Sequence, residues 1–208
     1  MGNADGGTLY IRTKEDTLQF AIMRTDSLGI ARGGTTGEAI TLPEVAMFSA
    51  DGAPNEKNVA SYSAITGETI NIEDAYDSDE FDFSGAKGFD ENTGYRSRSF
   101  LTVPLKNNQQ DVIGVLQLLN ALDDAGEVVA FTDEIQPLIE ALASQASVAL
   151  ENQNLIEAQK TLLDSFIELM ASAVDAKSPY TGGHCQRVPE LTKCWRGQRA
   201  TWVKARSQ

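Results

Sequence analysis

The sequence is poor in the residues that build metal centres, disulfide frameworks and membrane spans. Its 208 residues include one histidine and two cysteines, Cys185 and Cys194, which stand close together near the C-terminus. This pair predicts no disulfide framework and favours a reducing cytoplasm. No apolar run approaches the roughly 20 residues that a membrane-spanning helix needs. The N-terminus also lacks a basic-then-apolar leader pattern, so we expect neither secretion nor a membrane partner.

Positive charge is also scarce. The chain holds 17 Lys and Arg against 30 Asp and Glu, a formal net charge of −13. Such a surface repels phosphates, which argues against nucleic acid or an anionic membrane as partner. The hydrophobic fraction of 41% is nevertheless enough for a packed core. We therefore expect one domain with a substantial appendage.

The first two thirds of the chain show short alternating segments punctuated by glycine and polar turns. Predicted strands span residues 8–11, 17–23, 69–72, 100–105 and 112–119. Charged or amide-rich turns separate the first and the last pair, which predicts hairpins and a mainly antiparallel sheet. A short helix is predicted over residues 58–65, ending at Gly67, because glycine suits the left-handed position after a helix.

After Thr132 the apolar period changes from two to about three and a half. Thr132 can cap a helix over residues 133–175 that begins with Asp133 and Glu134. A heptad seam follows through Ile135, Leu142, Ala149, Ile156, Leu163 and Met170, with Ile139, Ala146, Ile167 and Val174 at the partner position and Gln153 and Lys160 interrupting it. Up to Asn152 this stripe could equally pack on the chain's own sheet; beyond it we expect a parallel coiled coil and hence a homodimer.

Residues 66–120 carry a family resemblance. A strand, an acidic loop, the turn TGYRSR (residues 93–98) and two strands joined by KNNQQD (residues 106–111) follow in order. This order resembles the GAF domain, in particular the cyclic-nucleotide-binding subtype of phosphodiesterases and adenylate cyclases. The resemblance implies an α+β fold, with a GAF-like antiparallel sheet flanked by helices, a sensory core over residues 1–132 and a long C-terminal helix. GAF domains commonly open with a helix that joins the dimer bundle, and here the first strand begins almost at once.

The resemblance also implies a ligand site for a small-molecule effector, with cyclic AMP or cyclic GMP as the possible ligand and no certain cofactor. Carried over by matching position, the ligand-binding residues are Thr8, Asp90, Thr93, Ser97 and Gln117, with Phe89 beside the pocket and Met23 and Arg24 where the family has an aromatic base-stacker and an acid. Strand alternation places Gln117 on the same face as Val115 and Leu119. Gln117 then faces either the ligand or the solvent.

Other features limit this reading. The family's Asn-Lys pair is Asn120-Ala121 here, so the family's salt bridge from that lysine cannot form. The GAF region holds no cysteine or histidine to attach a bilin or ligate a haem iron. The acidic loop over residues 73–82 could bind a divalent metal but is expected to be a solvated lid. Arg96 and Arg98 are expected to tie this loop to the sheet edge, with direct anion binding as the alternative.

A second resemblance begins near the C-terminus. Val174-Asp175-Ala176-Lys177, Ser178-Pro179-Tyr180-Thr181, Gly183-His184 and Arg187-Val188 resemble the opening of an HD-GYP phosphohydrolase domain. That bacterial family hydrolyses cyclic di-GMP at a multi-metal centre; we assign residues 176–192 to its truncated start. His184 would be an orphan ligand, and one imidazole cannot hold such a centre, so we expect no hydrolysis by this chain. Residues 193–208 are expected to be a disordered, non-native-looking tail or, alternatively, a basic recognition tail.

Two hypotheses follow for function. The chain is either a sensory module that regulates an HD-GYP effector through the long helix, or a ligand-free GAF dimerisation platform. Stabilisation by a ligand would separate the two.

Overall fold

A computed structural model describes residues 3–34 and 38–177 of the chain. The chain forms two compact units, with the boundary between residues 151 and 152. The predicted HD-GYP start from residue 178 onward, with His184, and the predicted tail over residues 193–208 lie outside the described residues, as does the side chain of Val174.

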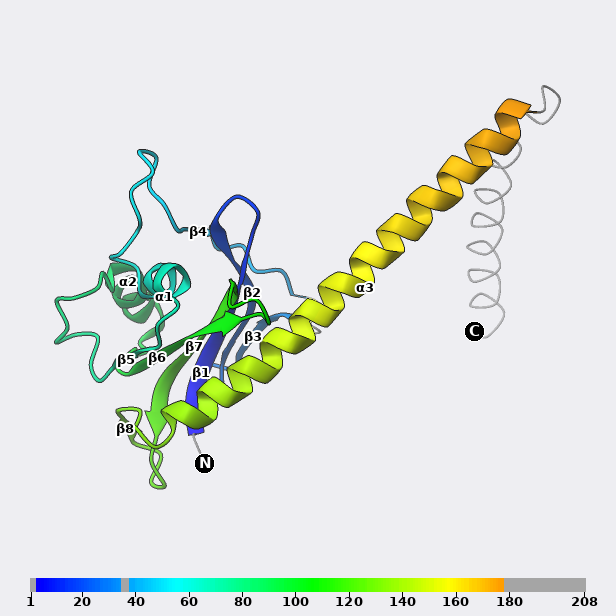
Figure 1. Ribbon diagram of the computed structural model, residues 1–208. Helices are drawn as coiled ribbons and strands as arrows, with labels where there is room; N and C mark the ends of the chain where they lie inside the picture. The colour runs from blue at the N-terminus through cyan, green and yellow to red at the C-terminus, as the bar shows by residue number, and fades with distance from the viewer. Residues whose placement is uncertain (1–2, 35–37, 178–208) are drawn as a thin grey trace, which may run out of the picture. The chain divides into compact units, whose positions relative to one another are not determined.

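The first unit is built on one antiparallel sheet, as predicted. Its strands are β1 (Asn3–Arg12), β2 (Thr17–Thr25), β3 (Ile30–Gly33), β4 (Val45–Ala46), β5 (Ile70–Ile72), β6 (Phe100–Lys106), β7 (Val112–Leu122) and β8 (Val128–Val129). Their order is β3-β2-β1-β7-β6-β5, with β4 paired to β2 and β8 paired to β7. The long central strands β1 and β7 therefore join two hairpins that are far apart in the sequence (Figure 1).

Both predicted hairpins are present, and local chemistry explains their turns. The β1–β2 turn places Asp16 at φ 54°, and the β6–β7 turn places Gln110 at φ 68°. In the second turn the Asn107 Oδ1 accepts hydrogen bonds from the backbone N–H of Gln109 and of Asp111, each at 2.9 Å. This short-range bonding of an Asn side chain to the following backbone is typical of tight turns.

Helix α1 (Val59–Thr66) matches its prediction closely. The Asn58 side chain accepts a hydrogen bond from the Ser61 N–H at 3.0 Å, and Gly67 ends the helix at φ 71°. Helix α2 (Ser84–Thr93) was not predicted. It contains Gly85 and Gly88, which weaken helix propensity, and it buries only Asp90.

Helix α3 (Gln136–Lys177) begins three residues later than predicted. Residues 133–135 form a turn instead, in which the N–H groups of Ile135 and Gln136 donate to the Thr132 carbonyl. Pro137 explains the start, because proline lacks an N–H and is tolerated in the first turn of a helix.

The sheet separates two layers of apolar side chains. On one face, α1 and α2 cover Tyr10, Val115 and Phe100; on the other, the first part of α3 packs against Leu101, Val103 and Leu105 (Figure 1). This confirms the α+β fold with flanking helices and a long C-terminal helix.

The apolar residues of α3 fall into two stripes. Ile139, Ala143 and Ala146 pack on the sheet, so the early part of the helix covers the apolar layer of Leu101, Val103 and Leu105. Leu142, at 55% exposure, lies outside that contact, so the predicted seam does not match the packed stripe there. Beyond residue 152 the seam residues Ile156, Leu163 and Met170 are 51%, 58% and 52% exposed.

None of the helices in the described part of the chain has the length and apolar character needed to cross a membrane.

Candidate functional site

Three predicted site residues, together with the neighbouring Thr102, form one row across the sheet. Thr8 of β1 pairs with Met23 of β2 on one side and with Gln117 of β7 on the other. Gln117 in turn pairs with Thr102 of β6. Because paired residues in a sheet share a face, their side chains lie on the same side.

This row faces α1 and α2. Gln117 alternates with Val115, which packs in the cluster under α1, and with Leu119, which packs against the cluster of Phe83 and Phe100. Gln117 therefore points inward, which decides between its two predicted orientations.

Hydrogen bonds hold the Gln117 amide in place. Its Oε1 accepts from the Tyr10 hydroxyl at 3.3 Å, and its Nε2 donates to the Thr102 Oγ1 at 3.1 Å. Burial raises the pKa of the Tyr10 phenol well above its usual range, so the phenol stays neutral. The row thus presents hydroxyl and amide groups without formal charge, which can both donate and accept hydrogen bonds.

Asp90 and Ser97, both predicted ligand contacts, bond to each other instead. The buried Asp90 carboxylate accepts hydrogen bonds from the Ser97 N–H, the Ser97 Oγ and the Tyr76 hydroxyl, each at 2.7 Å. The hydrogen bond to Asp90 raises the pKa of Tyr76. Asp90 therefore fixes the end of α2 against the turn at residues 93–98.

The two other predicted residues of α2 have local roles. The exposed Thr93 donates its hydroxyl proton to the Phe89 carbonyl at 2.8 Å, and Phe89 is half-buried. Ala86 of the same helix packs against the cluster that contains Phe83 and Phe100. Helix α2 therefore covers the sheet beside the Gln117 row.

Arg24 is placed on the opposite face of the sheet from Met23. It pairs with Gly7, and a Cβ on Gly7 would lie 3.2 Å from the Leu118 side chain in the layer under α3. The Arg24 Nε lies 2.7 Å from the Asp26 Oδ1, and its side chain is 69% exposed. The structure therefore does not bring Arg24 together with Thr8 and Gln117.

A buried polar network that sequence reasoning missed anchors the turn at residues 93–98. The Tyr95 hydroxyl donates to Asp5 Oδ2 at 2.5 Å and accepts from the Asn120 Nδ2 at 2.8 Å. The Asn120 Oδ1 accepts from the Arg98 N–H at 2.7 Å, and Asn120 itself is 1% exposed at φ 52°. Asn120 thus holds the turn directly, without a following lysine.

The charge state of this network is set by hydrogen bonds. Burial by itself would raise the pKa of Asp5, but hydrogen bonds from Ser27 and Tyr95 outweigh it and lower that pKa. Burial, followed by the bond to Asp5, raises the pKa of Tyr95. The sequence signal that could have indicated this network is Asp5, an acid beside two glycines in the opening strand.

The predicted link between the acidic loop and the sheet edge is confirmed. The Arg98 Nε lies 3.0 Å from Asp74 Oδ2, and its Nη1 donates to the Val128 carbonyl at 3.2 Å. The Arg96 guanidinium lies 4.7 Å from the centre of the Tyr76 ring. Over residues 3–34 and 38–177, no group of three or more His, Cys, Asp or Glu side chains is arranged to hold a metal ion.

Comparison with known families agrees with this architecture. The family model described as "GAF domain" matches residues 2–150. The chain belongs to the GAF domain family. The match includes the part of α3 that packs on the sheet.

Two curated relatives share part of this GAF domain. The chain is 33% identical over 104 residues to the dual 3',5'-cyclic-AMP and -GMP phosphodiesterase 11 of Drosophila melanogaster, covering 50% of this chain and 7% of that protein. It is 32% identical over 111 residues to the dual 3',5'-cyclic-AMP and -GMP phosphodiesterase 11A of Takifugu rubripes, covering 53% and 12%. The match thus spans a small fraction of either relative.

Among solved structures, the GAF domain from a phosphoenolpyruvate-protein phosphotransferase of Coxiella burnetii is similar in fold. Its TM-score is 0.51 at 14% identity, with 74% of this chain and 76% of that chain covered. This likeness concerns the fold alone.

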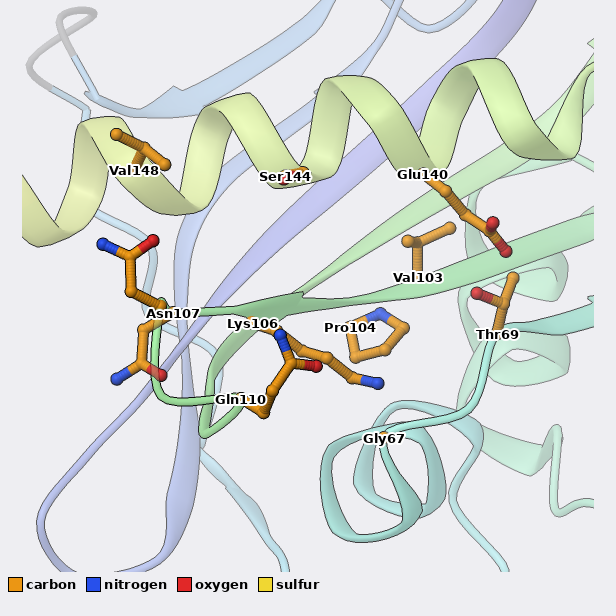
Figure 2. Close-up of a pocket in the computed structure, with 11 residues that line it drawn as sticks. Gly67, Thr69, Val103, Pro104, Lys106, Asn107, Gln110, Glu140, Ser144 and Val148 are labelled. Atoms are coloured by element: carbon orange, nitrogen blue, oxygen red, sulfur yellow. The ribbon is translucent and has the colours of Figure 1, made fainter.

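Two clefts of the GAF domain border α3, one at the edge of the sheet beside β6 and one on the face of the sheet that α3 covers. One has a volume of about 510 Å³ and polar lining from the β6–β7 hairpin (Figure 2). The other, of similar volume, is mainly apolar and is lined by Leu9, Ile22, Leu118 and Leu142, among others. Neither coincides with the inward face of Gln117.

Proposed function

We propose that this GAF domain binds a cyclic mononucleotide, cyclic AMP or cyclic GMP, on the sheet face under α1 and α2. In the row of Met23, Thr8, Gln117 and Thr102, the three polar side chains carry the proposal, because inward polar groups in register across a sheet supply the donors and acceptors that a ligand beneath a lid requires. The similarity to phosphodiesterases named for both cyclic nucleotides supports the same ligand class.

The proposal gives the predicted residues different tasks. Thr8 and Gln117 would bond the ligand, and the Met23 thioether would pack on the purine face. Asp90 and Ser97 would position α2 as part of the lid, since their polar atoms are bonded to each other. Arg24 takes no part in this assignment, because it lies on the other face of the sheet.

The output of the sensor is the second half of the proposal. Ligand closure would change the packing of α3 and pass the signal along that helix to an HD-GYP domain acting on cyclic di-GMP in the bacterial cytoplasm. The exposed Ile156, Leu163 and Met170 support self-association of α3 into a homodimer. The chain itself would act as a regulator without hydrolytic activity.

One observation favours a second candidate function, a ligand-free dimerisation platform. The Gln117 amide already bonds Tyr10 and Thr102 within the protein. If those bonds are permanent, the row is a structural feature of the core.

Paired titrations test the proposal. We would measure cyclic AMP and cyclic GMP binding by calorimetry to the full chain, to Gln117→Ala and to Gln19→Ala, an exposed glutamine of the same sheet. We expect Gln117→Ala to lose about five- to tenfold in affinity, since a good hydrogen bond is worth about 1–1.5 kcal/mol. No binding to the unaltered chain would favour the platform, and binding that Gln117→Ala leaves unchanged would exclude the row as the ligand site.

A further inference from the structure

The polar cleft on the α3 side lies where three elements meet. Strand β6 and its hairpin form the floor, the end of α1 forms one edge, and α3 forms the opposite wall (Figure 2). Its volume of about 510 Å³ falls in the range typical of small-molecule sites. None of the residues of the Gln117 row lines this cleft, which opens at the edge of the sheet.

One cation lines this cleft. Lys106, the last residue of β6, extends toward Gly67, and a Cβ on Gly67 would lie 3.3 Å from its Nζ. The ammonium therefore sits beside the C-terminal end of α1, where the helix dipole favours positive charge. Among the described residues, Lys106 has no carboxylate within 4.0 Å, so its charge is unpaired within the protein.

One anion lines the same cleft from the other wall. Glu140 extends from α3 toward the edge strand that follows Thr69 (Figure 2). It is half-buried, and it accepts one hydrogen bond, from the Gln136 Nε2 at 3.0 Å. Lys106 and Glu140 thus face one cleft from different walls without forming an ion pair.

Neutral donors and acceptors fill the space between these charges. The hydroxyls of Thr69 and Ser144 line the cleft, as does the Asn107 side chain, whose Oδ1 is occupied by the turn and whose Nδ2 remains a donor. Val103 and Pro104 supply an apolar floor. A ligand here would meet one positive group, one negative group and several hydrogen-bonding groups.

We propose that this cleft is a second ligand site, for a small zwitterion of the α-amino-acid class. The ligand carboxylate would bind Lys106 and its ammonium would bind Glu140. A purely anionic ligand would be repelled by Glu140 and by the chain's net charge of −13, and a purely cationic ligand would be repelled by Lys106. A zwitterion is the class whose two charges are both matched.

The position of the site gives it a consequence for the helix. Glu140 and Ser144 belong to the part of α3 that packs on the sheet, and Lys106 belongs to the sheet. A bound zwitterion would tie α3 to β6 and stabilise that packing. The site is independent of the proposed nucleotide site, so either can fail without the other.

The test is a nuclear magnetic resonance titration of the full chain with L-serine, L-glutamine and L-leucine, each to about 10 mM, which covers millimolar Kd values. Each amino acid is compared with its amide, which lacks the carboxylate, and with its N-acetyl form, which lacks the ammonium. We expect saturating amide shifts around Lys106, Asn107 and Glu140 for at least one amino acid, and weaker binding of both analogues.

Two variants assign the charges. Lys106→Gln should lower the affinity for the amino acid about tenfold, so that the amino acid and its amide bind equally well. Glu140→Gln should likewise make the amino acid and its N-acetyl form bind equally well. Lys14→Gln and Glu134→Gln, at exposed positions elsewhere, should leave binding unchanged. Dispersed spectra of each variant check that it is folded. No saturating shifts for any of the three, shifts away from the cleft, or analogues that bind equally well would overturn the proposal.

Discussion

Asp90 shows how a single carboxylate can position a loop. It is 4% exposed and accepts three hydrogen bonds, two of them from Ser97. A side chain so placed stabilises the covering helix α2, whose own sequence has little tendency to be helical.

Replacing this carboxylate should destabilise the domain. Asp90→Ala leaves the buried Ser97 N–H and hydroxyl without their acceptor, and we expect the free energy of unfolding to fall by about 2–3 kcal/mol. Urea denaturation followed by circular dichroism measures it. Glu91→Ala, at the exposed neighbouring position, should change it by less than about 0.5 kcal/mol. Equal effects of the two would contradict the role given to Asp90.

Asp5 makes part of the stability depend on pH. Its pKa is lowered in the folded state, so its contribution is fully present above the unfolded pKa of about 3.9 and is lost as pH falls through the lower folded value. We expect the stability difference between the unaltered chain and Asp5→Asn to be constant above about pH 5 and to shrink toward pH 3. Denaturation curves at several pH values measure it. A difference that grows on acidification would contradict the assigned sign.

At the scale of elements, α1 is held by its two ends. Asn58→Ala removes the side chain that accepts from the Ser61 N–H, and we expect a loss of about 1 kcal/mol in the free energy of unfolding. Asn108→Ala, on the exposed β6–β7 turn, is the matched control and should cost much less. Thermal or urea unfolding of both variants decides the point.

Helix α3 carries the proposed dimer contact after residue 152. Ile156→Asp combined with Leu163→Asp places charges on the exposed seam and should convert a dimer to a monomer in sedimentation velocity. Ala158→Asp combined with Ser165→Asp adds the same charge at positions outside the seam and should leave the dimer intact. A monomeric unaltered chain at micromolar concentration would contradict self-association through α3.

The elements that could be predicted are those with a complete local signal. Helix α1 has a cap at Asn58 and Gly67 at its end, and the β6–β7 hairpin has apolar strands around a polar turn. Helix α2 had no such signal, since its glycines and polar face indicate a loop. Its one buried residue, Asp90, is held by Ser97, which lies beyond the helix.

The candidate site was predictable only in part. Register across β2, β1 and β7 brings Met23, Thr8 and Gln117 together, and a sequence shows register only indirectly. Strand alternation alone could have separated Arg24 from Met23, because adjacent residues of a strand point to opposite faces. The Asp5–Tyr95 contact joins residues 90 positions apart, and no local pattern predicts such a contact.

At the scale of the whole molecule, the two faces of the sheet have different covers and different proposed sites. The face under α1 and α2 holds the proposed nucleotide row, the other face is covered by α3, and the polar cleft opens at the edge beside β6. A strongly acidic chain can bind a cyclic mononucleotide because that ligand carries a single negative charge, which neutral donors can solvate.

The central claim is cyclic mononucleotide binding, and thermal unfolding of the full chain titrated with cyclic AMP, cyclic GMP and cyclic di-GMP tests it most directly. A ligand at a hundred times its Kd adds about 2.7 kcal/mol to stability, or several degrees in Tm. We predict a saturating rise in Tm with cyclic AMP or cyclic GMP. The rise should persist in Lys106→Gln, because Lys106 lines the polar cleft and is not part of the Gln117 row. No rise with either mononucleotide would contradict the account.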